Sequence, residues 1–98
     1  MLSSYPACFF NEGNGYSVIF PDLNGGTCGD TLDEAIDMAI DFLAVYLFWL
    51  KEDNQTIPEP SSIDTINPID VISDLDYTFD DAFVKIISVD VEEYTKIH

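Results

Sequence analysis

The fold is decided by residues 31–52, which read TLDEAIDMAIDFLAVYLFWLKE. Thr31 and, three positions later, Glu34 form a capping box, and this pattern predicts that a helix begins at residue 32. Asp33 and Glu34 also place negative charge at the positive end of the helix dipole. Apolar residues then recur every three or four positions, which predicts a helix to about residue 52 whose buried face consists of Leu32, Ala35, Ile36, Ala39, Ile40, Leu43, Leu47 and Leu50.

The same helix carries a second apolar stripe, formed by Met38, Phe42, Val45 and Trp49, and every residue from 42 to 50 is apolar. A helix that is apolar on all sides is buried on more than one side, whereas a small domain offers it only one sheet. We therefore expect the apolar stripe to contact a second subunit, in a homodimer or higher homo-oligomer, or the long segment that follows the helix.

Before the helix, the sequence predicts an antiparallel hairpin and a short third strand. Residues 5–12 and 16–21 have strand-like composition, and Gly13-Asn14-Gly15 between them is a strong turn signal. Pro6 places the beginning of the first strand at a sheet edge or strand end. After a second turn, residues 27–28 form the predicted third strand.

After the helix, residues 54–81 contain seven acidic residues and no basic residue. Three prolines keep this segment extended or irregular, while scattered isoleucines indicate that it wraps around the domain with its carboxylates outward. Residues 83–91 are almost continuously apolar, which predicts a central strand buried on both faces. A right-handed crossover would make this last strand parallel to its neighbour.

These elements predict an α+β fold of βββαβ order, in which a small antiparallel three-stranded sheet is joined by one long helix and a final parallel strand. The chain has 98 residues, which is the size of a single domain. We therefore assign residues 1–98 to one domain that includes the acidic irregular segment 54–81.

The charge of the chain limits its partners. Three lysines, no arginine and 19 acidic residues give a formal net charge of −16, which disfavours direct binding to nucleic acid or to an anionic membrane. The expected partner is therefore cationic. The sequence has no apolar run of membrane-spanning length and no signal-peptide pattern at its start, so we expect a cytoplasmic protein in which Cys8 and Cys28 are free thiols.

The acidic residues raise the alternative of an RNase-H-like nuclease that holds metal ions between carboxylates. Their scatter argues against it: Glu12 ends a strand, Asp90 stands alone in the last strand, and four acids (Asp33, Glu34, Asp37 and Asp41) follow the polar side of the helix. The only histidine, His98, is terminal. We therefore predict no catalytic residue, no metal site and no cofactor.

Five short motifs occur in an order and spacing that resemble the HicB family of type II antitoxins: Tyr5-Pro6-Ala7, Gly15-Tyr16-Ser17-Val18, Phe20-Pro21-Asp22-Leu23, Gly29-Asp30-Thr31-Leu32 and Ile57-Pro58-Glu59-Pro60-Ser61. The resemblance implies the degenerate, partial RNase H fold of the family's N-terminal domain. Many members continue into a C-terminal DNA-binding domain, whereas this chain ends at His98. We therefore expect a single HicB-like domain without direct DNA binding. Three explanations of the missing domain stay open: the chain is a single-domain member of the family, a fragment, or a solitary relative with another role.

The resemblance also implies a function, which is to neutralise HicA, a small basic RNase toxin, by covering its RNA-binding or catalytic surface. The acidic charge suits such a partner, and we predict that the toxin contacts Asp64, Asp70, Asp74, Asp76, Asp80 and Asp81. The alternatives are the metal-dependent nuclease and a solitary regulatory or RNA-associated module without a toxin.

Overall fold

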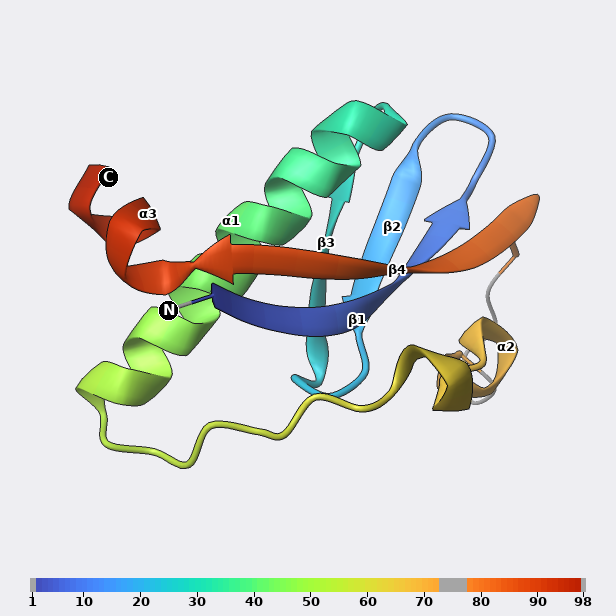
Figure 1. Cartoon of the computed structure of the whole chain (residues 1–98). Coiled ribbons are helices and arrows are strands. Elements are labelled where there is room, and N and C mark those ends of the chain that lie inside the picture. The colour runs from blue at the N-terminus through green and yellow to red at the C-terminus, as the bar shows by residue number, and fades with distance from the viewer. Residues whose placement is uncertain (1, 73–77, 98) are drawn as a thin grey trace.

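The computed structural model of the chain describes residues 2–72 and 78–97. Three strands come first, then a long helix, two short helical turns, a long strand and a last helix (Figure 1). In chain order these elements are β1 (Leu2–Asn11), β2 (Tyr16–Phe20), β3 (Gly25–Gly29), α1 (Leu32–Glu52), η1 (Ile63–Thr65), α2 (Pro68–Val71), β4 (Asp81–Asp90) and α3 (Val91–Ile97).

The four strands form one antiparallel sheet in the order β3-β2-β1-β4. The α+β class, the hairpin, the short third strand and the single long helix are confirmed. β1 and β4 pair over their whole length, from Leu2 opposite Asp90 to Asn11 opposite Asp81. β2 pairs with only the second half of β1, from Cys8 to Asn11. Pro6 therefore lies where β1 has a neighbour on one side only, which suits a residue that lacks a backbone N–H.

The predicted parallel orientation of the last strand is wrong. The segment between α1 and β4 is long enough to bring the chain back past the sheet, so that β4 starts beside the end of β1 and runs antiparallel to it. The handedness rule behind the prediction applies only to parallel crossovers. β4 is also an edge strand of the described sheet and not its centre; the strand buried on both faces is β1, whose residues 5–10 are all buried.

Helix α1 has the predicted bounds. The Thr31 hydroxyl accepts a hydrogen bond from the backbone N–H of Glu34 at 3.1 Å, and the Glu34 carboxylate accepts one from the N–H of Asp30 at 3.3 Å, which completes the capping box. The buried side of the helix is made of small and branched apolar residues, namely Ala35, Ala39, Leu43, Ala44 and Leu47. Leu32, which was expected on that side, is exposed.

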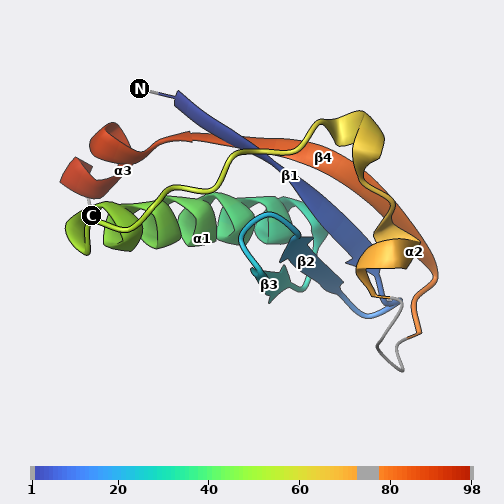
Figure 2. The same cartoon turned by 90° about the horizontal axis from the view of Figure 1, so that it is seen from below.

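The sheet separates two apolar clusters. On one face, α1 packs over a large core that includes Phe9, Val18, Phe20 and Leu43. On the other face a small cluster consists of Cys8, Phe10 and Ile72, with partly buried neighbours. Figure 2 shows α1 and α2 on opposite sides of the sheet. The alternation of side chains along β1 therefore supplies both clusters.

The segment after α1 is held to the sheet by hydrogen bonds. The Tyr5 hydroxyl donates to the carbonyl oxygen of Pro58 at 2.6 Å, and the Asp22 carboxylate accepts from the backbone N–H and the hydroxyl of Ser61 at 2.9 and 2.5 Å. Burial, and to a smaller extent the charges of Glu59 and Asp22, raise the pKa of Tyr5. In its described part, the segment is thus the ordered wrap that the sequence predicts.

Helix α3 was not predicted. The Asp90 carboxylate accepts a hydrogen bond from the N–H of Glu93 at 3.2 Å, and this bond lowers the pKa of Asp90. The Tyr94 hydroxyl donates to the Asp41 carboxylate at 2.9 Å and so joins α3 to α1. Burial, followed by this bond, raises the pKa of Tyr94.

Candidate interaction surfaces

The predicted toxin-binding carboxylates that the structure describes lie between α1 and the start of β4. Asp64 lies in η1, Asp70 in α2, Asp80 directly before β4 and Asp81 at its first position, and all four side chains are exposed. Figure 1 shows α2 and the start of β4 on the right-hand side of the molecule. We call these four residues the acidic end. Asp74 and Asp76 lie outside the described residues.

Local structure explains why the acidic end is exposed. Asn67 caps α2 by accepting a hydrogen bond from the N–H of Ile69 at 3.0 Å, and Pro68 occupies the first helical position. The backbone N–H of Asp80 bonds to the carbonyl oxygen of Asn11 at 2.6 Å, which brings the chain back to the end of β1. Backbone bonds and apolar contacts fix these turns, and their carboxylates face solvent, where they favour a cationic partner.

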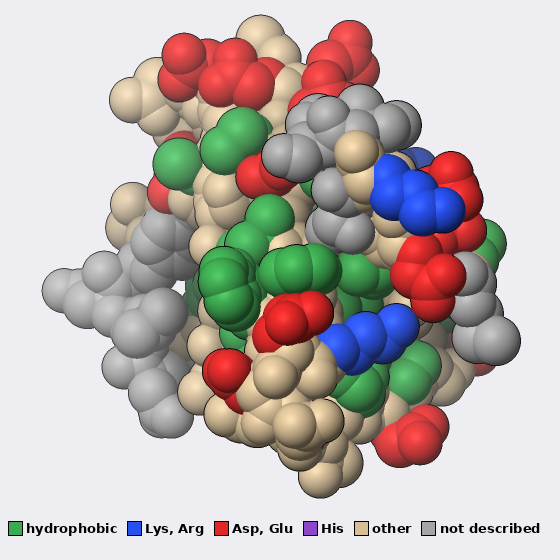
Figure 3. Space-filling model, turned by 90° about the vertical axis from the view of Figure 1, so that its left-hand side faces the viewer, with side chains coloured by type: hydrophobic (Ala, Val, Ile, Leu, Met, Phe, Trp, Pro, Cys, Tyr) green, Lys and Arg blue, Asp and Glu red, His purple; other side chains and the backbone are tan. Residues whose placement is uncertain are grey.

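The apolar stripe of α1 forms a second surface. Met38, Val45 and Trp49 are 42%, 42% and 58% exposed, whereas Phe42 is half-buried and stacks on Phe20 with ring centroids 5.5 Å apart. Figure 3 looks onto the side that carries α1 and α3, and hydrophobic side chains gather near its centre among acidic and basic ones. One of the two expectations was that segment 54–81 covers the stripe. The described part of that segment packs elsewhere and does not cover it.

Strand β3 lies directly beside the apolar stripe, which sequence reasoning did not foresee. A Cβ atom at Gly25 would lie 2.8 Å from Cζ of Phe42, and one at Gly29 would lie 2.5 Å from the backbone nitrogen of Ala35. These two glycines therefore let the strand approach the helix closely. The available signal was their spacing in Gly25-Gly26-Thr27-Cys28-Gly29, which places both on the same face of the strand.

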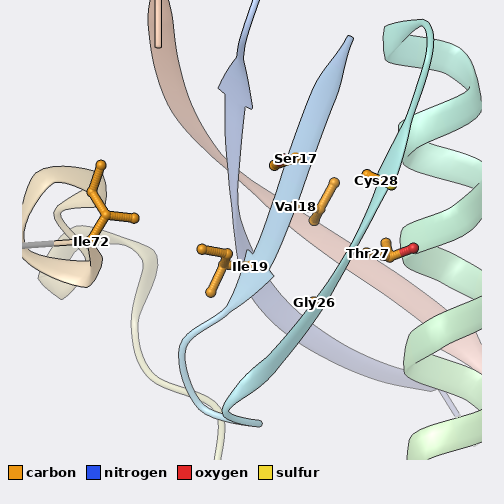
Figure 4. Close-up of a pocket in the computed structure, with 7 residues that line it drawn as sticks. All are labelled: Ser17, Val18, Ile19, Gly26, Thr27, Cys28 and Ile72. Carbon is orange, nitrogen blue, oxygen red and sulfur yellow. The ribbon is translucent and has the colours of Figure 1, made fainter. Parts of the chain in front are cut away.

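A shallow apolar groove lies on the opposite face of β2 and β3 (Figure 4). Its volume is about 290 Å³, and its lining is Ser17, Val18, Ile19, Gly26, Thr27, Cys28 and Ile72. None of these side chains carries a formal charge. The groove can therefore receive an apolar side chain of a partner, and its polar side-chain groups are the hydroxyls of Ser17 and Thr27 and the thiol of Cys28.

The nuclease alternative would need carboxylates that converge on metal ions. Within residues 2–72 and 78–97, no group of three or more His, Cys, Asp or Glu side chains is placed to hold a metal ion. Glu12, Asp33, Glu34, Asp37 and Asp41 are exposed, and Asp90 caps a helix. His98 lies outside the described residues.

The two cysteines are free thiols in different surroundings. Cys8 is buried in the small cluster, and burial raises its pKa to about 11. Since the thiolate is the reactive form, Cys8 is a packing residue in the folded protein. Cys28 is exposed on β3. None of the helices in the described part of the chain is both long and apolar enough to cross a membrane.

Comparison with known proteins identifies the family. Residues 5–97 match the family model described as HicB-like antitoxin of bacterial toxin-antitoxin system. The chain is 41% identical over 59 residues to antitoxin HicB 2 of Photorhabdus laumondii subsp. laumondii, a match that covers 59% of this chain and 42% of the relative. Antitoxin HicB 1 of the same organism is 43% identical over 53 residues, a match that covers 53% of this chain and 34% of the relative. The chain thus matches less than half the length of either relative.

Solved structures share the fold. A chain of a toxin-antitoxin complex from Streptococcus pneumoniae superposes with a TM-score of 0.87 at 33% identity, over 96% of this chain and 73% of that chain. The N-terminal domain of Burkholderia pseudomallei antitoxin HicB superposes with a TM-score of 0.65 at 22% identity, over 90% of this chain and 99% of that chain. The family match over almost the whole chain and the shared fold lead to the same conclusion: this chain belongs to the HicB-like antitoxin family of bacterial toxin-antitoxin systems.

Proposed function

We propose that this chain is a protein-binding module that neutralises a small, basic HicA-type RNase toxin by occlusion. The observation that carries the proposal is the acidic end, whose residues Asp64, Asp70, Asp80 and Asp81 are all exposed on a chain with a net charge of −16. Family membership supports it, as does the similarity to a chain solved within a toxin-antitoxin complex. The cytoplasm is the expected compartment, because both thiols are free.

Electrostatics sets how such a complex forms. A cationic toxin is attracted over a distance of about 10 Å at 0.1 M salt and is oriented toward the side with the highest density of carboxylates. Affinity then comes from the area that becomes buried around the initial contact. In this role the chain performs no chemistry, because covering the toxin's RNA-binding or catalytic surface is sufficient to block it.

The test is a binding assay with a small basic HicA-type protein, taken from the neighbouring reading frame if that frame encodes one. The native chain is compared with a variant that combines Asp64→Asn, Asp70→Asn, Asp80→Asn and Asp81→Asn. A matched control removes the same four charges elsewhere, through Asp37→Asn, Glu52→Gln, Asp53→Asn and Glu92→Gln. All eight side chains are exposed, so we expect both variants to fold.

We expect the native chain to bind and to inhibit RNA cleavage by the toxin. Loss of the acidic end should weaken binding by about tenfold or more, and the control should weaken it much less, because long-range attraction is screened while local contacts persist. The absence of any complex at moderate salt would refute the proposal. Cleavage of RNA by this chain with magnesium or manganese would support the nuclease alternative instead.

A further inference from the structure

We propose that the outer edge of β4 binds an extended segment of the basic toxin, which pairs with it as a further strand of the sheet. This pairing rests on the proposed function, because it names the element of this chain that holds the toxin. The carboxylates at the start of β4 attract the partner, and the edge of the strand then binds it through backbone hydrogen bonds.

β4 is a ten-residue strand with a neighbour on one side only. It pairs with β1 from Asp81 to Asp90, and no strand within residues 2–72 and 78–97 lies on its other side. In Figure 1, β4 crosses in front of β1 and α1, and no described segment is drawn across it. An edge strand directs unpaired backbone N–H and C=O groups outward, and an extended segment of another protein can pair with them.

The register shows which residues of β4 have outward backbone groups. The N–H of Glu12 bonds to the carbonyl oxygen of Gly15, so Glu12 directs its backbone groups toward β2, and alternation along β1 gives Pro6 the same direction. Pro6 lies opposite Ile86. Residues opposite each other in an antiparallel pair either exchange hydrogen bonds or both point away from each other. The backbone groups therefore point away from β1 at every second residue of the strand, namely Ala82, Val84, Ile86 and Ser88.

Ile86 supplies apolar area beside this edge. Its side chain shares a face of the sheet with Ala82 and Val84, which pack against the small cluster, but Ile86 lies beyond that cluster and is 40% exposed. An incoming strand would lie about 4.8 Å beyond β4 and would bring every second side chain to the same face. Pairing at the edge would therefore also cover Ile86.

The charges along β4 favour a cationic partner over a second copy of this chain. Asp81 begins the strand directly after Asp80, Asp90 ends it, and Lys85 is its only basic residue. Two copies that paired antiparallel about the middle of β4 would place Asp81 of each opposite Asp90 of the other, and like charges in opposite positions are destabilising. A toxin strand with Lys or Arg near Asp81 and an acid opposite Lys85 has complementary charges. Lys85 thus resists indiscriminate pairing, as charged residues on edge strands do.

The experiment is residue-resolved amide hydrogen exchange of the full chain, measured by NMR with the chain alone and with it saturated by a small basic HicA-type protein. In the chain alone, the amides that face β1 should be protected, and these are Phe83, Lys85 and Ile87. The outward amides of Ala82, Val84, Ile86 and Ser88 should exchange rapidly. The toxin should slow exchange of the outward set by about tenfold or more and leave the first set protected as before.

Proline variants test the same edge by binding. Ile86→Pro removes an outward N–H without removing a hydrogen bond to β1, and Ile86→Thr is the matched control that keeps the N–H. Ser88→Pro and Ser88→Ala form a second pair in case the first proline variant does not fold, which circular dichroism establishes. The proline variants should bind about tenfold more weakly than their controls, mainly through faster dissociation, whereas neutralising Asp80 and Asp81 should mainly slow association.

The outcomes separate the edge pairing from the proposed function. A complex in which the outward amides of β4 still exchange rapidly would overturn the edge pairing and leave the proposed function intact, as would folded proline variants that bind like their controls. The absence of any complex would overturn both. Protection of the same amides in the chain alone, as its concentration rises, would assign the edge to a second copy and would contradict the pairing with a toxin.

Discussion

The two faces of the sheet are built from opposite kinds of sequence. On the α1 face, a capped 21-residue helix buries a continuous core that includes Phe9, Phe20 and Leu43. On the α2 face, the described part of a proline-containing segment buries Ile72 against Cys8 and Phe10, packs Ile66, Val71 and Phe79 around them partly buried, and holds its carboxylates in solvent. We conclude that packing on the first face supplies most of the free energy of folding. The second face buries fewer apolar side chains and keeps its carboxylates exposed.

The largest expected effect is a core deletion on the α1 face. Leu43→Ala should lower the free energy of unfolding by about 3–5 kcal/mol, because Leu43 is fully buried among close-packed neighbours that cannot collapse onto the cavity. Ile72→Ala, in the small cluster, should cost about 2 kcal/mol, the lower end of the range for such changes. Urea unfolding of both variants measures the difference. Equal losses in the free energy of unfolding would contradict the conclusion that the α1 face supplies most of the stability.

The contrast also explains what the sequence could predict. The α1 bounds followed from local signals, because Thr31, Glu34 and the apolar spacing act within a few residues of one another. The direction of β4 could not be obtained in this way, since it depends on the path of 28 residues with weak local preferences. The apolar run in β4 suggested burial on both faces, but its edge position leaves Ile86 exposed.

The interaction surfaces were predictable to different degrees. The acid-rich composition indicated that Asp64, Asp70, Asp80 and Asp81 lie on the surface, because carboxylates are rarely buried. The apolar stripe was visible as a periodic pattern. Its proximity to the free edge of β3 was not, because it arises from the tertiary contact between Gly25 and Phe42.

A smaller effect is expected where β3 approaches α1. Gly29→Ala would place a Cβ 2.5 Å from the backbone nitrogen of Ala35, so the helix or the strand must shift. We expect a loss of about 1–3 kcal/mol in the free energy of unfolding, as in other overpacked sites. Gly13→Ala is the comparison, because its positive φ of 89° adds strain without a backbone clash and should cost about 1 kcal/mol. A Gly29→Ala protein as stable as the native chain would show that this contact is not tight.

The attachment of the acidic segment should contribute less and depend on pH. Tyr5→Phe removes the hydrogen bond to Pro58 and should cost about 1 kcal/mol. Because folding raises the pKa of Tyr5, its contribution is fully present below pH 10, the ordinary tyrosine value, and is lost as pH rises through the higher folded value. Unfolding of both proteins from pH 7 to 11 should therefore show the two free energies converging. A constant difference across that range would contradict the assignment.

The smallest expected effect concerns the two thiols. Cys28 should react with a maleimide in the folded protein, whereas Cys8, with its pKa raised to about 11 by burial, should react only on unfolding. Mass spectrometry counts the modified thiols, and Cys28→Ser is the control that should show no modification in the native state. Rapid modification of Cys8 in that variant would mean that the small cluster opens readily. The packing on the α2 face would then be even less stable than its small apolar cluster indicates.

Hydrogen exchange of the complex with the basic toxin tests the central claim most directly, because it shows which side of the molecule the toxin covers. The account predicts new protection at residues 63–71 and 79–82, which carry the exposed carboxylates, with β3 and the α1 stripe unchanged by the toxin. Toxin-induced protection confined to β3 and residues 38–49 would contradict it, since the partner would then occupy the uncharged face.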